Sequence, residues 1–492
     1  MIRAKINGIE DEFADGVSVL EAARQMGIDI PTLCDDKRLD PVGACRMCLV
    51  EIKGRAHETV SCTTILADGM EVETHTEPVE TARKWNLRML AGNYPADAYA
   101  QFPDKPFHKL ATQYGLTETD FTGGHATARD DSHTYINVDM SRCINCYACV
   151  RICADVQGQF VWHVLGRGEE SQIMPDSFGA FGDSTCVSCG ACSDACPTGA
   201  LEDKTVIERG FATEWTKTTC PYCGTGCEMN VGVRDDRVVQ VKPVMDAPVN
   251  YGHLCVKGRY AFDFVDAGDR VTEPMIREGG DWRVVSWEEA ISYTADKLKA
   301  IDAEFGKESI AVLGSARATN EENYLAQKFT RVVLGTNNVD CCARVCHTPS
   351  AAAMKMMIGT GAMTNSFDDI EKAKTIILCG ANPSENHPIP GARIKQAVIK
   401  NGTKLIVIDP RKTELTKYAD VHLQLRPGTN ILMFNAIAHA IIDEGLTDPE
   451  FIATRVDEFE EFKAFVAEYS PEAVATRCGV DAELIRKAAR IY

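Results

Sequence analysis

Cysteine is the residue whose number and spacing point most directly to chemistry in this chain of 492 residues. There are 21 cysteines, and sixteen of them lie in four groups of four that end at Cys255. The amino-terminal sequence has no apolar signal core and no twin-arginine pair, so we expect a cytoplasmic protein whose thiols stay reduced. Reduced thiols at regular spacing favour metal sites over disulfides.

Two of the groups repeat the spacing C-x2-C-x2-C-x3-C of bacterial two-cluster ferredoxins, in which the fourth cysteine binds the other cluster. One four-iron cluster is therefore predicted to be bound by Cys143, Cys146, Cys149 and Cys196. The other is predicted to be bound by Cys186, Cys189, Cys192 and Cys153. Neither chance nor a zinc site would readily produce this spacing twice.

The remaining two groups each have one distant member. The first group suits a two-iron cluster, with a zinc site as the alternative, and consists of Cys34, Cys45, Cys48 and Cys62. The last group suits a third four-iron cluster and consists of Cys220, Cys223, Cys227 and Cys255. Lys257 follows this last group by two residues, and a lysine in such a place is ordinarily a solvated charge.

The elements that position these groups change along the chain. "MIRAKINGIE" and "CLVEIKG" alternate like strands, and "SVLEAARQMG" has a helical pattern. Beyond about residue 270 the pattern becomes strand, loop and helix, with strands expected within 309–317, 374–388 and 404–414 and helices within 321–334 and 389–402. This alternation predicts an open, mostly parallel sheet that binds ligands at the carboxyl ends of its strands. The glycine-rich loops of ordinary NAD and ATP sites are missing from the sequence.

Length and net charge limit the number of domains and the classes of partner that the chain can have. A chain of 492 residues exceeds a single core of about 250–300 residues, so several domains are expected. The formal charge of −19 argues against nucleic acid and anionic membrane surfaces as partners. No apolar run reaches the roughly 18 residues of a membrane span. Several iron–sulfur clusters in one chain indicate a path for single electrons between a reaction and a redox partner.

The stretches "CPYCGTGC", "CVKGR", "VDCCARVCHTPS", "GTGAMTN", "GANPSENHP" and "IDPRK", in that order, resemble the catalytic subunit of formate dehydrogenases. The segments before them resemble the large cytoplasmic form that works with an NAD-reducing flavoprotein containing FMN and iron–sulfur clusters. The resemblance covers nearly the whole chain. It implies reversible oxidation of formate to CO2 at molybdenum or tungsten held by two molybdopterin guanine dinucleotides. It also implies one two-iron and three four-iron clusters.

Carried over position by position, the resemblance assigns roles to single residues. Cys346 matches the metal ligand, His347 matches the adjacent active-site histidine, and Lys257 matches a lysine between the proximal cluster and a pterin. The positions in segments that hold the dinucleotides are Asn382, Glu385, Asn386, Asp409, Arg411, Gly428 and Asn430, with Asn382 and Asp409 the firmer matches. Arg344 is expected to add a positive charge near the cofactor. Cys341 and Cys342 are expected to pack as small apolar side chains.

The resemblance also predicts multidomain α+β and α/β organisation. The expected parts are a β-grasp 2Fe-2S ferredoxin domain (1–77), a helical linker (78–135), a two-cluster 4Fe-4S ferredoxin domain (136–209), a proximal 4Fe-4S domain (213–269) and a molybdopterin-oxidoreductase α/β region (270–492).

Two departures from the family accompany this organisation. Relatives carry a histidine and three cysteines in the linker. Here Tyr94 and Ala98 stand at the histidine and first cysteine positions, so we expect no cluster there despite His108. The sequence stops within a helical pattern at Tyr492, and we expect the family's remaining cofactor domain and a formate-binding arginine to follow.

Three other functions fit part of the pattern. A complex I-type iron–sulfur subunit would conduct electrons without metal–pterin catalysis, but "RVCH" and the missing linker cluster weigh against it. Another molybdopterin oxidoreductase, such as a cytoplasmic nitrate reductase, is less consistent with the Cys346–His347 pair. A zinc-binding scaffold does not account for the ferredoxin spacing.

Overall fold

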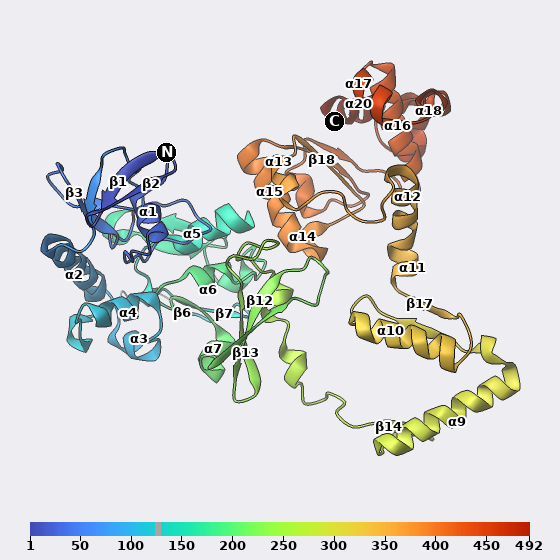
Figure 1. Ribbon diagram of the computed structural model, residues 1–492, viewed down its shortest axis with the longest axis horizontal. Coiled ribbons are helices and arrows are strands. Elements are labelled where there is room, and N and C mark those ends of the chain that lie inside the picture. The colour runs from blue at the N-terminus through green and yellow to red at the C-terminus, as the bar shows by residue number, and fades with distance from the viewer. Residues whose placement is uncertain (124–128) are drawn as a thin grey trace. The chain divides into compact units, whose positions relative to one another are not determined.

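The computed structural model describes residues 1–123 and 129–492, apart from the side chain of Glu169. These residues form two compact units, a larger one made of Met1–Ala261 with Phe367–Tyr492 and a smaller one made of Phe262–Ser366. Figure 1 labels their helices and strands. No helix in the described part of the chain is long and apolar enough to cross a membrane.

The larger unit begins with a five-stranded sheet in the order β2-β1-β5-β3-β4. Strands β1 and β5 are parallel, and β1 also pairs with β2 in an antiparallel hairpin. Alternate side chains of β1, Ala4 and Ile6, enter a core that Val19 and Leu20 of the helix complete. The elements are β1 (Ile2–Ile6), β2 (Ile9–Phe13), α1 (Val19–Gln25), β3 (Leu49–Ile52), β4 (Thr59–Val60) and β5 (Glu71–Glu73). The strands and helix expected here are present.

Three helices follow the sheet: α2 (Glu77–Gly92), α3 (Ala96–Gln101) and α4 (Pro106–Gln113). Thr76 caps α2 by accepting a hydrogen bond from the N–H of Val79 at 3.5 Å. Their shared core is rich in aromatic rings, including Tyr94 and Phe107, whose ring centroids lie 5.0 Å apart. The helical linker predicted from the sequence is therefore a packed helical segment.

The next segment places two short helices at the centre of one hydrophobic core, which also contains Trp162 and Phe181. Its elements are β6 (Arg129–Asp130), β7 (Ile136–Asp139), α5 (Ala148–Ile152), β8 (Trp162–Leu165), β9 (Gln172–Pro175), α6 (Ala191–Ala195), β10 (Leu201–Asp203) and α7 (Lys204–Arg209). An antiparallel sheet and one helix complete this half of the unit: β11 (Glu214–Thr219), β12 (Glu228–Arg234), β13 (Arg237–Pro243) and α8 (Val256–Tyr260).

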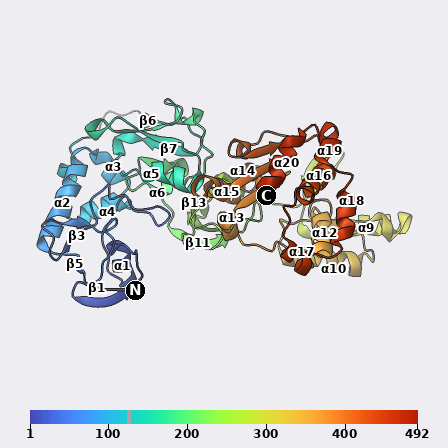
Figure 2. The ribbon, with the colours of Figure 1, turned by 90° about the horizontal axis from the view of Figure 1, so that it is seen from above.

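The carboxy-terminal part of the larger unit has a parallel sheet in the order β18-β19-β20 between two layers of helices. In β19, Leu405 and Val407 face α15, whereas Ile406 and Ile408 face the helices of the other layer. Figure 2 shows α16 to α20 gathered together. The elements are α13 (Asp368–Lys372), β18 (Thr375–Cys379), α14 (Pro383–Asn386), α15 (Pro388–Asn401), β19 (Lys404–Ile408), β20 (Val421–Leu423), α16 (Asn430–Asp443), α17 (Pro449–Arg455), α18 (Phe459–Val466), α19 (Pro471–Cys478) and α20 (Ala482–Ile491).

The smaller unit contains a second, separate parallel pair of strands. The strand expected within 309–317 is β16, and it pairs with β17 rather than joining the sheet of β18. The elements are β14 (Met275–Glu278), β15 (Asp281–Val284), α9 (Trp287–Phe305), β16 (Val312–Gly314), α10 (Asn320–Lys328), β17 (Val339–Cys341), α11 (Ala343–Cys346) and α12 (Thr348–Ile358). The α/β region thus forms two parallel sheets where the sequence indicated one.

Candidate functional site

The first cysteine group lies in the loops around β3 and β4, where it forms two pairs. The thiol of Cys45 hydrogen-bonds to Cys34 and lowers the pKa of Cys34 to about 6. In the same way the thiol of Cys62 lowers the pKa of Cys48 to about 6. The charge on Cys34 also acts on Cys48 and Cys62, so the two pairs are neighbours. The same hydrogen bonds raise the pKa of the donor thiols Cys45 and Cys62, so one thiol of each pair ionises readily. The thiolate is the form in which a cysteine binds a metal.

The next two groups each surround a small cavity, with one cysteine contributed by the other motif. One cavity is lined by Cys143, Cys146, Cys149 and Cys196. The other is lined by Cys153, Cys186, Cys189 and Cys192. These are the crossed sets expected from the ferredoxin spacing. No three His, Cys, Asp or Glu side chains within residues 1–123 and 129–492 converge on a single metal ion.

The loops of these two cavities share one backbone conformation, in which a residue with positive φ donates its N–H to a cysteine sulfur. Asn145 and Ser188, each two residues after the first cysteine of its motif, have φ angles of 52° and 54°. This left-handed conformation lets the N–H of Asn145 donate to Sγ of Cys143 at 3.4 Å and that of Ser188 donate to Sγ of Cys186 at 3.3 Å. Such N–H···S bonds stabilise negative charge on sulfur. Four thiols around each cavity, with backbone donors to sulfur, fit an iron–sulfur cluster.

The two-iron group and the two ferredoxin groups are contiguous. Cys34 and Cys146 belong to one buried cluster of side chains, together with Ala148. Arg151 of α5 ties the two segments together by donating to the backbone carbonyls of Cys34 and Asp40. In the shared core of the two cavities, the charge of Cys192 acts on Cys149. The three groups therefore follow one another through the larger unit.

The last group is closed by a backbone hydrogen bond from N–H of Cys220 to the carbonyl of Cys227 at 2.8 Å. Burial, with the charges of the other three cysteines, raises the pKa of Cys227 to about 12. A Cβ on Gly258 would meet Sγ of Cys220 at 3.4 Å, so α8 passes directly beside this thiol. Lys257, half-buried on α8, places its positive charge near Cys220. The lysine singled out from the sequence is thus at this group.

The predicted dinucleotide residues gather at the carboxyl ends of β18, β19 and β20. Asn382 follows β18 and is 5% exposed, and its Oδ1 has no hydrogen-bond partner in the described part of the chain. Asp409 follows β19, is 4% exposed and accepts a hydrogen bond from N–H of Arg411 at 2.8 Å. A buried amide oxygen without a partner is costly unless a ligand satisfies it, so this sheet edge fits a polar ligand.

The other residues expected at this edge are more open. Glu385, Asn386, Arg411, Gly428 and Asn430 are exposed, and Gly428 has a φ of 84°. Nδ2 of Asn430 lies 3.9 Å from Sγ of Cys379, the last residue of β18. Cys379 therefore belongs to this edge, although its sequence context, a strand followed by Gly380, gave it no particular role.

Cys346 and His347 lie in the smaller unit, at the junction of α11 and α12, and both side chains are exposed. The preceding strand β17 and an ion pair of 2.6 Å between Arg344 and Asp340 hold the start of α11. Arg344 is thus engaged with Asp340. Cys341 is half-buried, whereas Cys342 is exposed, so the expectation that Cys342 packs as an apolar side chain is wrong.

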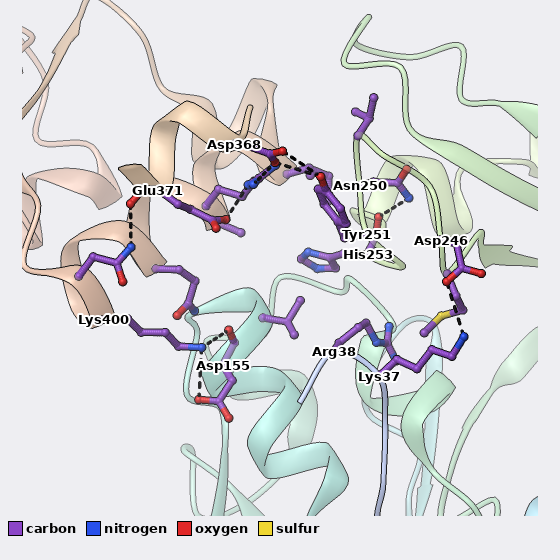
Figure 3. A pocket seen from close by; sticks show the side chains of 18 residues that line it. Lys37, Arg38, Asp155, Asp246, Asn250, Tyr251, His253, Asp368, Glu371 and Lys400 are labelled. Carbon is purple, nitrogen blue, oxygen red and sulfur yellow. Dashed lines mark hydrogen bonds and ion pairs between the residues drawn. The ribbon is translucent and has the colours of Figure 1, made fainter. Parts of the chain in front are cut away.

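A cavity of about 830 Å³ in the larger unit was not indicated by any motif. Figure 3 shows it between the segments that carry Arg38, Asp155, His253 and Lys400. His253 is buried, and burial together with the charge of Arg38 lowers its pKa to about 3. None of the predicted site residues lines this cavity.

Comparison with known families matches four successive segments. Residues 1–77 match a 2Fe-2S iron–sulfur cluster binding domain, and residues 133–202 match the ferredoxin-like domain of NADH-quinone oxidoreductase subunit 3. Residues 213–267 match the molybdopterin oxidoreductase Fe4S4 domain, and residues 270–471 match molybdopterin oxidoreductase. The order of domains expected from the sequence is confirmed.

Individual relatives are similar over most of this chain. It is 32% identical to "Probable oxidoreductase YjgC" of Bacillus subtilis, over 98% of this chain and 53% of the relative. It is 30% identical to "Putative formate dehydrogenase YrhE" of the same organism, over 98% of this chain and 54% of the relative. Acetylene hydratase from Pelobacter acetylenicus is 31% identical, with a TM-score of 0.49, over 56% of this chain and 38% of that one. The chain spans about half the length of the curated relatives it matches.

Proposed function

Since iron–sulfur domains are followed in this chain by a molybdopterin oxidoreductase segment, we propose that it forms part of a formate dehydrogenase, with electrons leaving through its clusters. The observation that carries this proposal is the adjacent pair Cys346–His347 within the molybdopterin oxidoreductase segment. Relatives about 30% identical that are named "Putative formate dehydrogenase" support the same substrate.

In this proposal the chain's residues hold the cofactor and position formate. The thiolate of Cys346 would bind molybdenum or tungsten, because a soft sulfur ligand suits such a centre. Asn382 and Asp409 would bind a guanine dinucleotide through its base or ribose, with the N–H groups of the following loops near phosphate. The metal–dinucleotide group would supply two-electron chemistry at the C–H bond of formate. His347 would orient formate or accept a proton.

The cysteine groups would then carry electrons singly in the order that their contacts support. Lys257 lies beside the Cys220 group, and α8 joins that group to the ferredoxin cavities through Arg259 and Asp194. The buried cluster that contains Cys34 and Cys146 extends the series to the two-iron group. The match to a ferredoxin-like domain of NADH-quinone oxidoreductase supports a redox partner that we propose to be an NAD-reducing, FMN-containing subunit.

The test is metal, pterin and iron analysis of the complete protein, combined with formate-dependent reduction of a dye. We expect molybdenum or tungsten, guanine dinucleotide, one two-iron and three four-iron clusters, and turnover with formate. Replacing Cys346 by Ser should abolish dye reduction and leave the EPR signals of the clusters in place. Arg317→Lys, an exposed change elsewhere in the smaller unit, is the control and should keep full activity.

Two results would contradict parts of the proposal. Complete protein with intact clusters but without molybdenum, tungsten or pterin would identify an electron-conducting subunit of the complex I type. Loaded protein that oxidises a reduced dye with nitrate, but never reduces the dye with formate, would assign it to another molybdopterin oxidoreductase. Unchanged formate turnover in Cys346→Ser would refute the role of that thiol.

A further inference from the structure

The helical segment α2 to α4 contacts one loop of the cavity that is lined by Cys143, Cys146, Cys149 and Cys196. This loop, residues 196–200, contains Cys196, the one cysteine of that cavity that comes from the second motif. The N–H of Phe107 donates to the carbonyl of Pro197 at 3.1 Å. The ring of Phe102 lies so close that a Cβ on Gly199 would meet it at 3.2 Å. We call residues 196–200 the Cys196 loop.

Tyr94 adds a buried hydrogen bond to the same loop. Its side chain is fully buried, and its hydroxyl donates to the carbonyl of Thr198 at 2.8 Å. On the other side, Nε2 of His108 lies 2.8 Å from the same hydroxyl oxygen. Nδ1 of His108 donates to the carbonyl of Phe102 at 2.5 Å. An unbroken series of buried polar contacts therefore runs from Phe102 through His108 and Tyr94 to the Cys196 loop.

This series lies within electrostatic reach of a cluster ligand. Oγ1 of Thr198 lies 3.6 Å from Sγ of Cys196. Burial, and secondly the charge of Cys196, raises the pKa of Tyr94. The hydroxyl therefore stays protonated and donates its hydrogen bond to the carbonyl of Thr198. The ion pair of 2.7 Å between Lys105 and Glu202 clamps the chain just beyond the loop. The reduction potential of an iron–sulfur cluster depends on hydrogen bonding and solvent exposure around its sulfurs.

We propose that Tyr94 and His108 are positioning residues for the four-iron cluster bound in part by Cys196. They hold the Cys196 loop in place and thereby set the reduction potential of that one cluster. The inference rests on the iron–sulfur part of the proposed function and is independent of the substrate. The helical segment thus has a role in electron transfer through its contacts, with no cluster of its own required.

The test is an anaerobic redox titration of the complete protein, reduced with dithionite and followed by EPR. Tyr94→Phe removes the hydroxyl oxygen, so the carbonyl of Thr198 and Nε2 of His108 each lose their hydrogen-bond partner. Loss of a buried hydrogen bond corresponds at most to a roughly tenfold change in the reduced-to-oxidised ratio of the cluster. We expect one four-iron centre to shift by up to about 59 mV, the one-electron equivalent of tenfold, with the other centres unchanged.

Tyr99→Phe is the matched control. Tyr99 lies in the same helical segment, but its hydroxyl contacts Oγ1 of Thr112 at 2.6 Å. This variant should leave all cluster potentials at their original values. His108→Gln should move the same centre as Tyr94→Phe, by a smaller amount, because Tyr94 keeps its hydroxyl.

Each outcome decides the proposal. Wild-type potentials for all centres in Tyr94→Phe overturn it, and so does an equal shift in Tyr99→Phe. Where Tyr94→Phe fails to accumulate with iron, His108→Gln decides: a shift or loss of one four-iron centre supports the role, and a full set of wild-type centres refutes it. Because dithionite supplies the electrons, failure of formate oxidation leaves these readings unaffected.

Discussion

The guanidinium of Arg259 joins two cluster-bearing segments. Its side chain is 1% exposed and forms ion pairs with Asp194 at 2.5 Å and with Asp203 at 2.8 Å. Asp203 also accepts a hydrogen bond from the hydroxyl of Tyr260 at 2.8 Å. Because Asp194 lies between two cysteines of the ferredoxin motif, this network ties α8 to the ferredoxin core. A lone arginine in "VKGRY" carried no sequence signal of that role.

Replacing Arg259 by Met should destabilise the larger unit strongly. The change leaves the carboxylate of Asp203 buried without its cation, and breaking such a pair costs about 3–5 kcal/mol. Arg3→Met is the control, because Arg3 pairs with Glu12 at 2.8 Å on the surface, where a pair is worth about 0–1 kcal/mol. Denaturant unfolding followed by circular dichroism measures both. Equal losses in the two variants would show that the buried network contributes little.

His133 should make stability depend on pH. Its Nδ1 accepts from the N–H groups of Tyr135 and Ile136, both at 3.1 Å, and Nε2 faces Ser188. Burial, followed by the charge of Lys204, lowers the pKa of His133 below its usual value. Below about pH 6.5 His133 therefore becomes protonated in the unfolded chain but stays neutral in the folded chain. The free energy of unfolding consequently falls as the pH drops.

The measurement is the free energy of unfolding at pH 7.5 and pH 5.5. His133→Gln should lose less stability between the two pH values than the original protein, although it is less stable at pH 7.5. His57→Gln, at an exposed histidine, should keep the original pH dependence. The same pH dependence in all three proteins would mean that His133 titrates normally in the fold.

At the scale of elements, the ends of the strands and the sets of cysteines around each cavity were predictable, because both follow from short sequence patterns. Asn382 and Asp409 follow apolar strands, and parallel strands bring their carboxyl ends to one edge. The separate pairing of β16 with β17 was not predictable, because an apolar strand does not specify its partner. The hydrogen bond from Tyr94 to Thr198 was also missed, since the two residues lie 104 positions apart in the chain.

The edge formed by β18 and β19 makes a prediction that separates binding from folding. Oδ1 of Asn382 is buried and has no partner within residues 1–123 and 129–492, and such an atom costs about 1–3 kcal/mol. Asn382→Leu should therefore leave the cofactor-free protein at least as stable as the original and lower the guanine dinucleotide content of the loaded protein. Asn435→Leu is the control, because Nδ2 of Asn435 on α16 is likewise buried without a partner among the described residues, and Asn435 is not one of the residues predicted to bind the dinucleotide.

Dinucleotide release by nucleotide analysis and unfolding of the cofactor-free protein are the two readings. The control should gain stability and keep its dinucleotide. Normal dinucleotide content in Asn382→Leu would remove that residue from the binding site.

At the scale of the whole molecule, the proposed chemistry is divided between the two units. The sixteen grouped cysteines and the edge of β18 to β20 belong to the larger unit, whereas Cys346 and His347 belong to the smaller one. Within the larger unit, the cysteine groups are connected by the buried cluster that contains Cys34 and Cys146 and by the ion pair of Arg259 with Asp194. The account therefore predicts that electrons released at Cys346 reach clusters in the other unit.

The most direct measurement is EPR of the complete, metal-loaded protein mixed with formate under anaerobic conditions, with no dye or other reductant. The account predicts that formate alone produces the signals of reduced iron–sulfur clusters, and that Cys346→Ser shows them only after dithionite is added. Loaded protein whose clusters stay oxidised with formate, yet are reduced by dithionite, would contradict the central claim.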